Sequence, residues 1–85
     1  MESAVKSVAD RTLNVLSSVT NTKEVKRNLD LKLFDAGILD SLGAVLLIVA
    51  LSEEFGIEIS PSEIERDDLA TPRKIIEFIT KWIEQ

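Results

Sequence analysis

The amino-acid sequence predicts an all-α fold: a four-helix bundle of three longer helices and one short helix, with a long loop between the first two. Three stretches carry apolar residues at steps of three and four, the spacing of amphipathic helices. Two Ser/Thr-Pro pairs mark helix starts. The alternation Ile57-Glu58-Ile59 is too short to indicate a sheet. We expect the long helices to form an irregular antiparallel bundle.

Length and composition limit the classes of protein that fit. With 85 residues, the chain is expected to form one domain over residues 1–85. An apolar fraction of 45% supports a folded core, and no run approaches the roughly 18 apolar residues of a membrane span. Glu2, Lys6 and Asp10 interrupt the amino terminus, so it lacks the layout of a signal peptide. We therefore expect a cytoplasmic protein.

Charge is distributed unevenly along the chain, whose net charge is −5. Residues 1–34 carry +2, residues 35–68 carry −8 and residues 69–85 carry +1. This acidity argues against nucleic acid as a partner. It favours protein partners with basic surfaces, although a solvated acidic surface explains the run beyond Glu53 equally well.

The first helix is expected over residues 3–19, followed by a long connection over residues 20–40. The apolar face of this helix recurs at helical spacing and comprises Val5, Val8, Ala9, Thr12, Leu13, Leu16 and Val19. The connection is too apolar for a solvated linker, because it contains Val25, Leu29, Leu31, Leu33 and Phe34. We expect these side chains to hold it against the helices. Long loops in small domains tend to be functional.

The second helix is predicted over 41–55, with Gly56 at the position where left-handed caps occur. One face comprises Ala44, Leu47, Ile48, Leu51 and Phe55. The nearly opposite face is also apolar and comprises Leu42, Val45, Leu46 and Val49. A helix packed on one side needs only the first face. The second face is therefore either buried under another element, for some of its residues the long loop, or exposed to a partner, and we favour a partner for Leu46 and Val49.

Two further helix starts follow. Ser60-Pro61 with Glu63 resembles a capping box and predicts a short helix that ends near residues 66–68. Thr71-Pro72 begins the last helix. Its apolar face is expected to close the core and comprises Ile75, Ile76, Phe78, Ile79, Trp82 and Ile83.

Ser41 is the candidate functional residue. A serine at a helix start is most often a cap, but Asp40 is at least as good a cap. If Asp40 caps, the Ser41 hydroxyl is left at a helix terminus that favours an attached phosphate. The chain has no histidine, no cysteine and no Gly-x-Ser-x-Gly elbow, so we expect no catalytic residue, no metal site and no enzyme activity. Asp67-Asp68 is more simply a solvated pair than a metal or acid/base site.

The stretch Leu33-Phe34-Asp35-Ala36-Gly37-Ile38-Leu39-Asp40-Ser41-Leu42 resembles the acyl carrier protein family. The resemblance extends over nearly the whole chain, including Glu53-Glu54-Phe55-Gly56-Ile57. It implies an acyl-carrier-like four-helix bundle. It also implies that a phosphopantetheinyl transferase attaches 4′-phosphopantetheine from coenzyme A to Ser41.

A narrower resemblance to the D-alanyl carrier proteins of Gram-positive bacteria rests on three stretches. These are Val25-Lys26-Arg27-Asn28-Leu29-Asp30, the Asp40-Ser41 motif, and Arg66-Asp67-Asp68-Leu69-Ala70-Thr71-Pro72-Arg73-Lys74-Ile75-Ile76. Leu42, Ile64 and Leu69 depart from the aromatic or Met residues frequent in that family. The resemblance implies three kinds of partner: the transferase, a D-alanine:carrier ligase, and membrane proteins that transfer D-alanine to lipoteichoic acid. It implies that Asp40, Leu42, Val45, Leu46 and Val49 meet these partners.

Two alternatives share most of these observations. An acyl carrier of fatty acid or polyketide synthesis uses the same serine with a different cargo. A helical protein-interaction module without a prosthetic group uses Ser41 only as a cap and the Leu46–Val49 face as a docking surface.

Overall fold

The computed structural model describes residues 7–84, and all regular structure in this range is helical. The α-helices are α1 (Val8–Thr20), α2 (Glu24–Arg27), α3 (Ser41–Phe55) and α4 (Pro72–Glu84). Two short 3₁₀ helices, η1 (Pro61–Glu63) and η2 (Arg66–Leu69), lie between α3 and α4. The predicted all-α, carrier-like bundle is confirmed.

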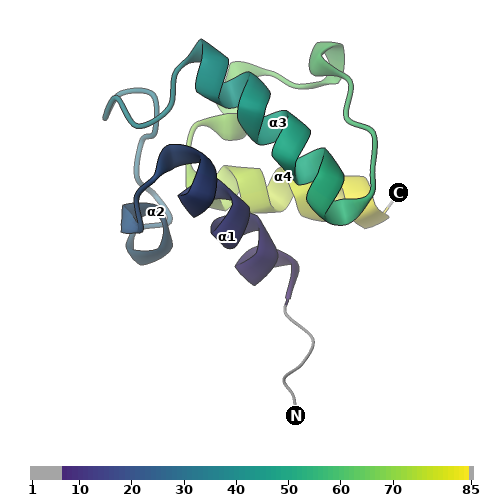
Figure 1. The fold of residues 1–85 in the computed structure, drawn as a ribbon, viewed down its shortest axis with the longest axis horizontal. Helices are drawn as coiled ribbons and strands as arrows, with labels where there is room; N and C mark the ends of the chain where they lie inside the picture. The colour runs from purple at the N-terminus through teal and green to yellow at the C-terminus, as the bar shows by residue number, and fades with distance from the viewer. Residues whose placement is uncertain (1–6, 85) are drawn as a thin grey trace.

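The three longer helices enclose one buried apolar cluster. Helix α1 packs against both α3 and α4, and it runs in the direction opposite to α3 (Figure 1). The buried members of the cluster come from every part of the fold: Leu16, Val25, Leu33, Leu39, Leu47, Ile48, Leu51, Ile59, Leu69, Ile75 and Ile79. Val25 and Leu33 are 0% exposed, which confirms that the long connection is held against the helices.

Helix α1 begins at Val8, so Ser7, which lies inside the range predicted for the first helix, is a cap and not a helical residue. Ser7 is extended and its side chain accepts a 3.1 Å hydrogen bond from the Asp10 N–H, so the helix starts at Val8. The predicted start at residue 3, and Val5 on the predicted apolar face, lie outside the described residues. The helix ends at Asn21, which adopts a left-handed conformation with φ 59°.

Helix α2 and the two 3₁₀ helices differ from the expected short elements. Helix α2 lies within the connection that we expected to be a loop and buries Val25. The single short helix expected after Ser60 is instead two 3₁₀ turns. The predicted capping box at Ser60 does not form, because the Ser60 hydroxyl hydrogen-bonds to that of Ser62 at 2.9 Å. A comparable contact forms later, where the Asp68 carboxylate accepts a 2.9 Å bond from the Glu65 N–H.

Helix α4 begins as predicted, with the Thr71 hydroxyl accepting a 3.1 Å hydrogen bond from the Lys74 N–H. Ile75 and Ile79 are 0% exposed, whereas the predicted core residue Ile83 is 40% exposed. Ile83 lies in the last turn of α4, where Trp82 and not Ile83 packs against the core.

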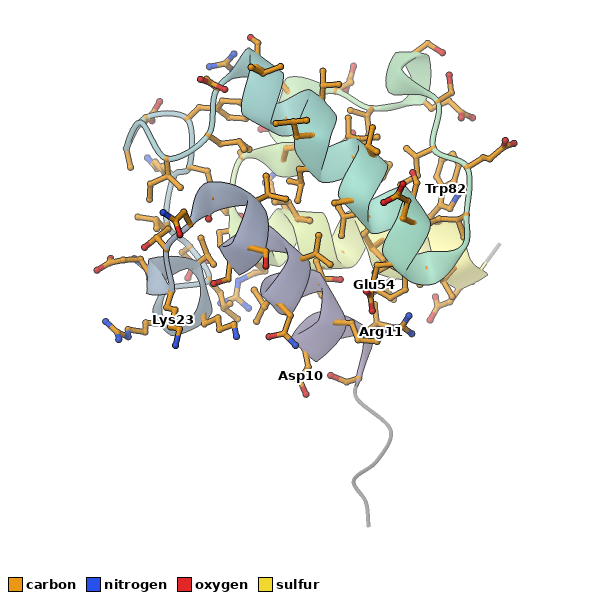
Figure 2. The ribbon with its side chains drawn as sticks, in the orientation of Figure 1. Asp10, Arg11, Lys23, Glu54 and Trp82 are labelled. Atoms are coloured by element: carbon orange, nitrogen blue, oxygen red, sulfur yellow. The ribbon has the colours of Figure 1, made fainter. Side chains whose placement is uncertain are left out.

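Arg11 joins α1 to the end of α3 (Figure 2). Its Nε donates to the Glu54 carboxylate at 2.9 Å, and its Nη2 donates to the Glu54 carbonyl oxygen at 2.7 Å. The same guanidinium lies 4.4 Å from the centroid of the Phe55 ring. Three contacts from one side chain therefore join α1 to the end of α3.

Within residues 7–84, none of the helices has the length and apolar character needed to cross a bilayer.

Candidate attachment site at the start of α3

Asp40, and not Ser41, caps α3. Asp40 has an extended backbone, and its carboxylate Oδ1 accepts a 2.7 Å hydrogen bond from the Gly43 N–H. Ser41 is the first helical residue and is exposed. Within the part of the chain that the structure describes, its hydroxyl forms no hydrogen bond. The hydroxyl is therefore accessible beside the first backbone N–H groups of a 15-residue helix, where negative charge is stabilised.

A tight turn over residues 33–39 directly precedes Asp40 and Ser41. The Leu33 carbonyl oxygen accepts hydrogen bonds from the N–H groups of Ile38 at 3.0 Å and Leu39 at 3.1 Å. Gly37 occupies the left-handed region with φ 73°, which glycine adopts without a steric penalty. Leu33 and Leu39 are both buried, so the two ends of the turn are anchored in the core.

Helix α3 has two apolar faces, as its sequence predicts, and in the structure one is buried and the other is exposed. Leu47, Ile48 and Leu51 are buried. The exposed fractions on the other side are 68% for Leu42, 52% for Val45, 53% for Leu46 and 51% for Val49. The long loop does not cover this second face. The sequence left open whether it was covered, and the structure leaves all four side chains at least half exposed on the helix that Ser41 begins.

A groove of about 570 Å³ lies between α3 and the segment that returns from its end. Val45, Ile48 and Val49 line one side, and Ile57 and Ile59 line the other. Its charged lining residues are all glutamates: Glu53, Glu58 and Glu63. Because residues four apart share a helix face, Ser41 lies one turn before Val45 on the side of α3 that opens into the groove. Sequence reasoning missed this groove, since it exists only where residues 57–63 fold back along α3.

Residues 10–79 match a family model described as a phosphopantetheine attachment site. The D-alanyl carrier protein of Lacticaseibacillus rhamnosus is 41% identical over 73 residues, covering 86% of this chain and 90% of the relative. The chain belongs to the D-alanyl carrier protein family. D-alanyl carrier proteins of Listeria monocytogenes (42% over 67 residues, 79% of this chain and 86% of the relative) and Enterococcus faecalis (38% over 72 residues, 85% and 92%) are similar.

These findings confirm the resemblance first seen in the sequence and the cofactor it implied. A D-alanyl carrier protein has a phosphopantetheine attachment domain, and the start of α3 fits that group chemically. It offers a free hydroxyl for the phosphodiester, unpaired N–H groups for the phosphate oxygens, and an apolar wall one turn away for the pantetheine chain.

Proposed function

We propose that Ser41 is the residue that carries 4′-phosphopantetheine and that the loaded cargo is D-alanine, held as a thioester. The observation that supports this most directly is the exposed, unbonded Ser41 hydroxyl beside the Asp40 cap in a chain of this family. When bound, the group supplies the thiol that a chain without cysteine lacks. The work of the chain is to present this thiol, so we propose a carrier and not an enzyme.

The partners follow from the same proposal. A phosphopantetheinyl transferase attaches the arm, a D-alanine:carrier ligase loads it, and membrane proteins receive the alanine for lipoteichoic acid. Each partner meets the same exposed surface in turn, comprising Asp40, Leu42, Val45, Leu46 and Val49. Such encounters are small and transient, because each partner must release the carrier to the next. We further propose that residues 1–85 act as one carrier domain in the cytoplasm.

The attachment is tested by the intact mass of the chain after incubation with coenzyme A, Mg²⁺ and a promiscuous phosphopantetheinyl transferase. The wild-type chain is expected to gain one phosphopantetheine, and Ser41→Ala is expected to gain none while retaining the circular dichroism of the wild type. Ser18→Ala is the matched control, because Ser18 is also exposed on a helix. An arm that persists in Ser41→Ala overturns the assignment.

The cargo is tested by adding D-alanine, ATP and the D-alanine ligase to the modified chain. A further alanyl increment that hydroxylamine removes supports the D-alanyl thioester. An arm without alanine indicates an acyl carrier of another pathway, and absence of the arm indicates a helical binding module.

The partner surface is tested by Val49→Lys and Leu46→Asp. Both side chains are about half exposed, so these variants are expected to retain stability while raising the KM of the ligase for the carrier. Ile83→Asp, at an exposed position on α4, should leave KM unchanged. Equal changes in the ligase KM at all three positions would contradict a partner surface that is confined to one side of α3.

A further inference from the structure

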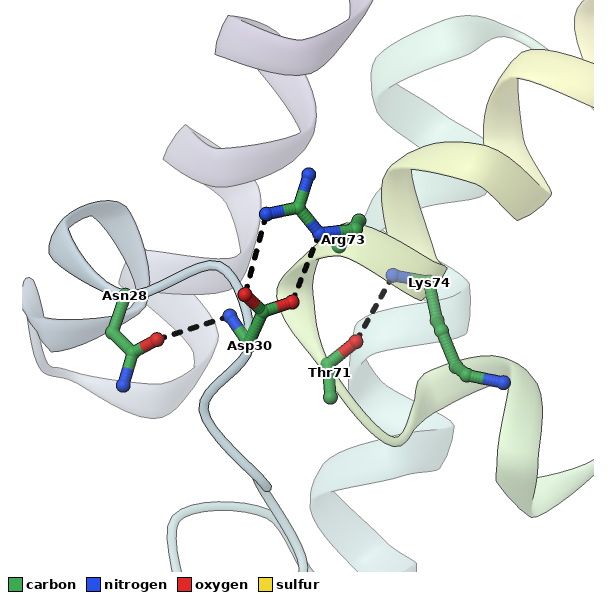
Figure 3. A network of polar contacts seen from close by, with 5 residues as sticks. All are labelled: Asn28, Asp30, Thr71, Arg73 and Lys74. Carbon is green, nitrogen blue, oxygen red and sulfur yellow. Dashed lines mark hydrogen bonds and ion pairs between the residues drawn. The ribbon is translucent and has the colours of Figure 1, made fainter.

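Residues 66–74, here called the clasp, hold the segment that leads to Ser41. Arg73 makes a two-point ion pair with Asp30, with Nε at 2.9 Å and Nη2 at 3.3 Å from the two carboxylate oxygens (Figure 3). The Arg73 N–H also donates to the Leu29 carbonyl oxygen at 2.9 Å. The hydrogen bond and positive charge of Arg73 lower the pKa of Asp30 below its ordinary value.

A second contact of the clasp lies closer to the site. The guanidinium of Arg66 lies 3.9 Å from the centroid of the Phe34 ring. Phe34 belongs to the tight turn before Ser41, where its carbonyl oxygen accepts a 3.1 Å hydrogen bond from the Gly37 N–H. Arg66 therefore covers one side of the turn through a cation–π contact.

Backbone hydrogen bonds connect the clasp to the attachment site in two steps. The Leu33 N–H donates to the Ala70 carbonyl oxygen at 2.9 Å, and the Leu33 carbonyl oxygen accepts from Ile38 and Leu39. Leu39 immediately precedes the Asp40 cap. Ala70 is thus linked through Leu33, which is 0% exposed, to Leu39, the residue before Asp40.

We propose that Arg66 and Arg73 are positioning residues that hold the 33–39 turn in the conformation that presents Ser41 to its transferase. This inference rests on the proposed role of Ser41. Most of the clasp packs against the rest of the fold. Leu69 and Pro72 are buried, and Arg66 and Arg73 lie against the segment that leads to Ser41.

The test measures amide hydrogen exchange and transfer kinetics on Arg66→Ala, Arg66→Lys and Arg73→Ala. Arg27→Ala is the matched control, because it removes the same charge from an exposed arginine that forms no ion pair within residues 7–84. In Arg66→Ala we expect exchange at Ile38 and Leu39 to rise about two- to fivefold, as for loss of an exposed cation–π contact. Exchange at Leu16, in the core of α1, should not change.

The kinetic result separates positioning from general destabilisation. If the turn is less often in its competent conformation, the transferase KM for the carrier rises by the factor by which the competent fraction falls, while kcat is kept. Arg66→Lys should recover part of both effects, since the ammonium also interacts with the ring. If Arg73→Ala unfolds the chain, the two variants Arg66→Ala and Arg66→Lys alone decide whether the inference holds.

Three outcomes overturn the inference: unchanged exchange at Ile38 and Leu39, equal exchange increases at Leu16, or an effect of Arg27→Ala as large as that of Arg66→Ala. A wild-type chain that takes no arm contradicts the proposed function instead. The exchange measurement on the unmodified chain would still decide the structural part of the inference.

Discussion

The Asp40 carboxylate accepts a 2.7 Å hydrogen bond from the backbone N–H of Gly43. This bond gives the capping role to Asp40 and leaves the neighbouring Ser41 hydroxyl free. A capping serine would have its oxygen occupied by a backbone N–H. The pairing of Asp40 with Gly43 therefore leaves the Ser41 hydroxyl outside the capping interaction.

Removing the cap should destabilise the chain. Asp40→Ala is expected to lower the free energy of unfolding by about 1 kcal/mol, whereas Asp40→Asn, which can still accept the bond, should lose less. Urea denaturation followed by circular dichroism measures both. Asp35→Ala, at an exposed position in the preceding turn, is the control. Equal losses in Asp40→Ala and Asp40→Asn would contradict a hydrogen-bonding role.

Gly37 and Gly56 provide a matched pair of left-handed positions, with φ 73° and 64°. Neither has an atom within 4 Å of an added Cβ, so alanine at either meets backbone strain and not a clash. Each substitution is expected to cost about 1 kcal/mol of stability. Only Gly37→Ala should slow phosphopantetheine transfer, because only Gly37 lies in the turn before Ser41. Equal transfer rates in the two variants would show that the turn does not control presentation.

Thr12 carries a buried hydroxyl, 0% exposed, that has no hydrogen-bond partner in the described part of the chain. Thr12→Val keeps the shape and removes the unpaired group, so it should raise the free energy of unfolding by about 1 kcal/mol. Thr80→Val is the control and should be destabilising or neutral, because the Thr80 hydroxyl donates to the Ile76 carbonyl oxygen at 2.7 Å. A loss of stability in Thr12→Val would reveal a partner for the hydroxyl.

The Asp30–Arg73 pair should make stability depend on pH in acid. Arg73 lowers the pKa of Asp30 in the folded chain, while the unfolded value is about 3.9. Because the pKa of Asp30 is lower in the folded chain than in the unfolded chain, the ionised carboxylate stabilises the fold at pH values above the unfolded pKa. This contribution disappears as the pH falls through the folded pKa. The difference in unfolding free energy between wild type and Asp30→Asn should therefore be largest near neutral pH and shrink in acid. Urea titrations across this range measure it.

The prediction for the Asp30–Arg73 pair is contradicted if the difference in unfolding free energy between wild type and Asp30→Asn stays constant down to the lowest pH at which the chain folds. Asp35→Asn, whose side chain forms no ion pair within residues 7–84, corrects for the change in net charge. Added salt should reduce the effect, because both partners are exposed.

Much of the fold could be predicted because its signals are local. Helix α3 lies between the caps Asp40 and Gly56, and it begins and ends in the structure at the residues that the sequence indicates. Thr71-Pro72 likewise begins α4. The predictions were least accurate where tertiary packing competes with weak local preference, as in α2, in the two 3₁₀ turns and at Ile83.

The sequence by itself determined the helical class, the extent of α3, and the position of Ser41 behind a better cap, because capping and periodicity act within a few residues. Only the tertiary structure decided that the second face of α3 is exposed and that a groove lies beside it. It also paired Asp30 with Arg73, 43 residues away. Such contacts depend on how the helices pack, and no spacing within one segment specifies which distant side chain will meet it.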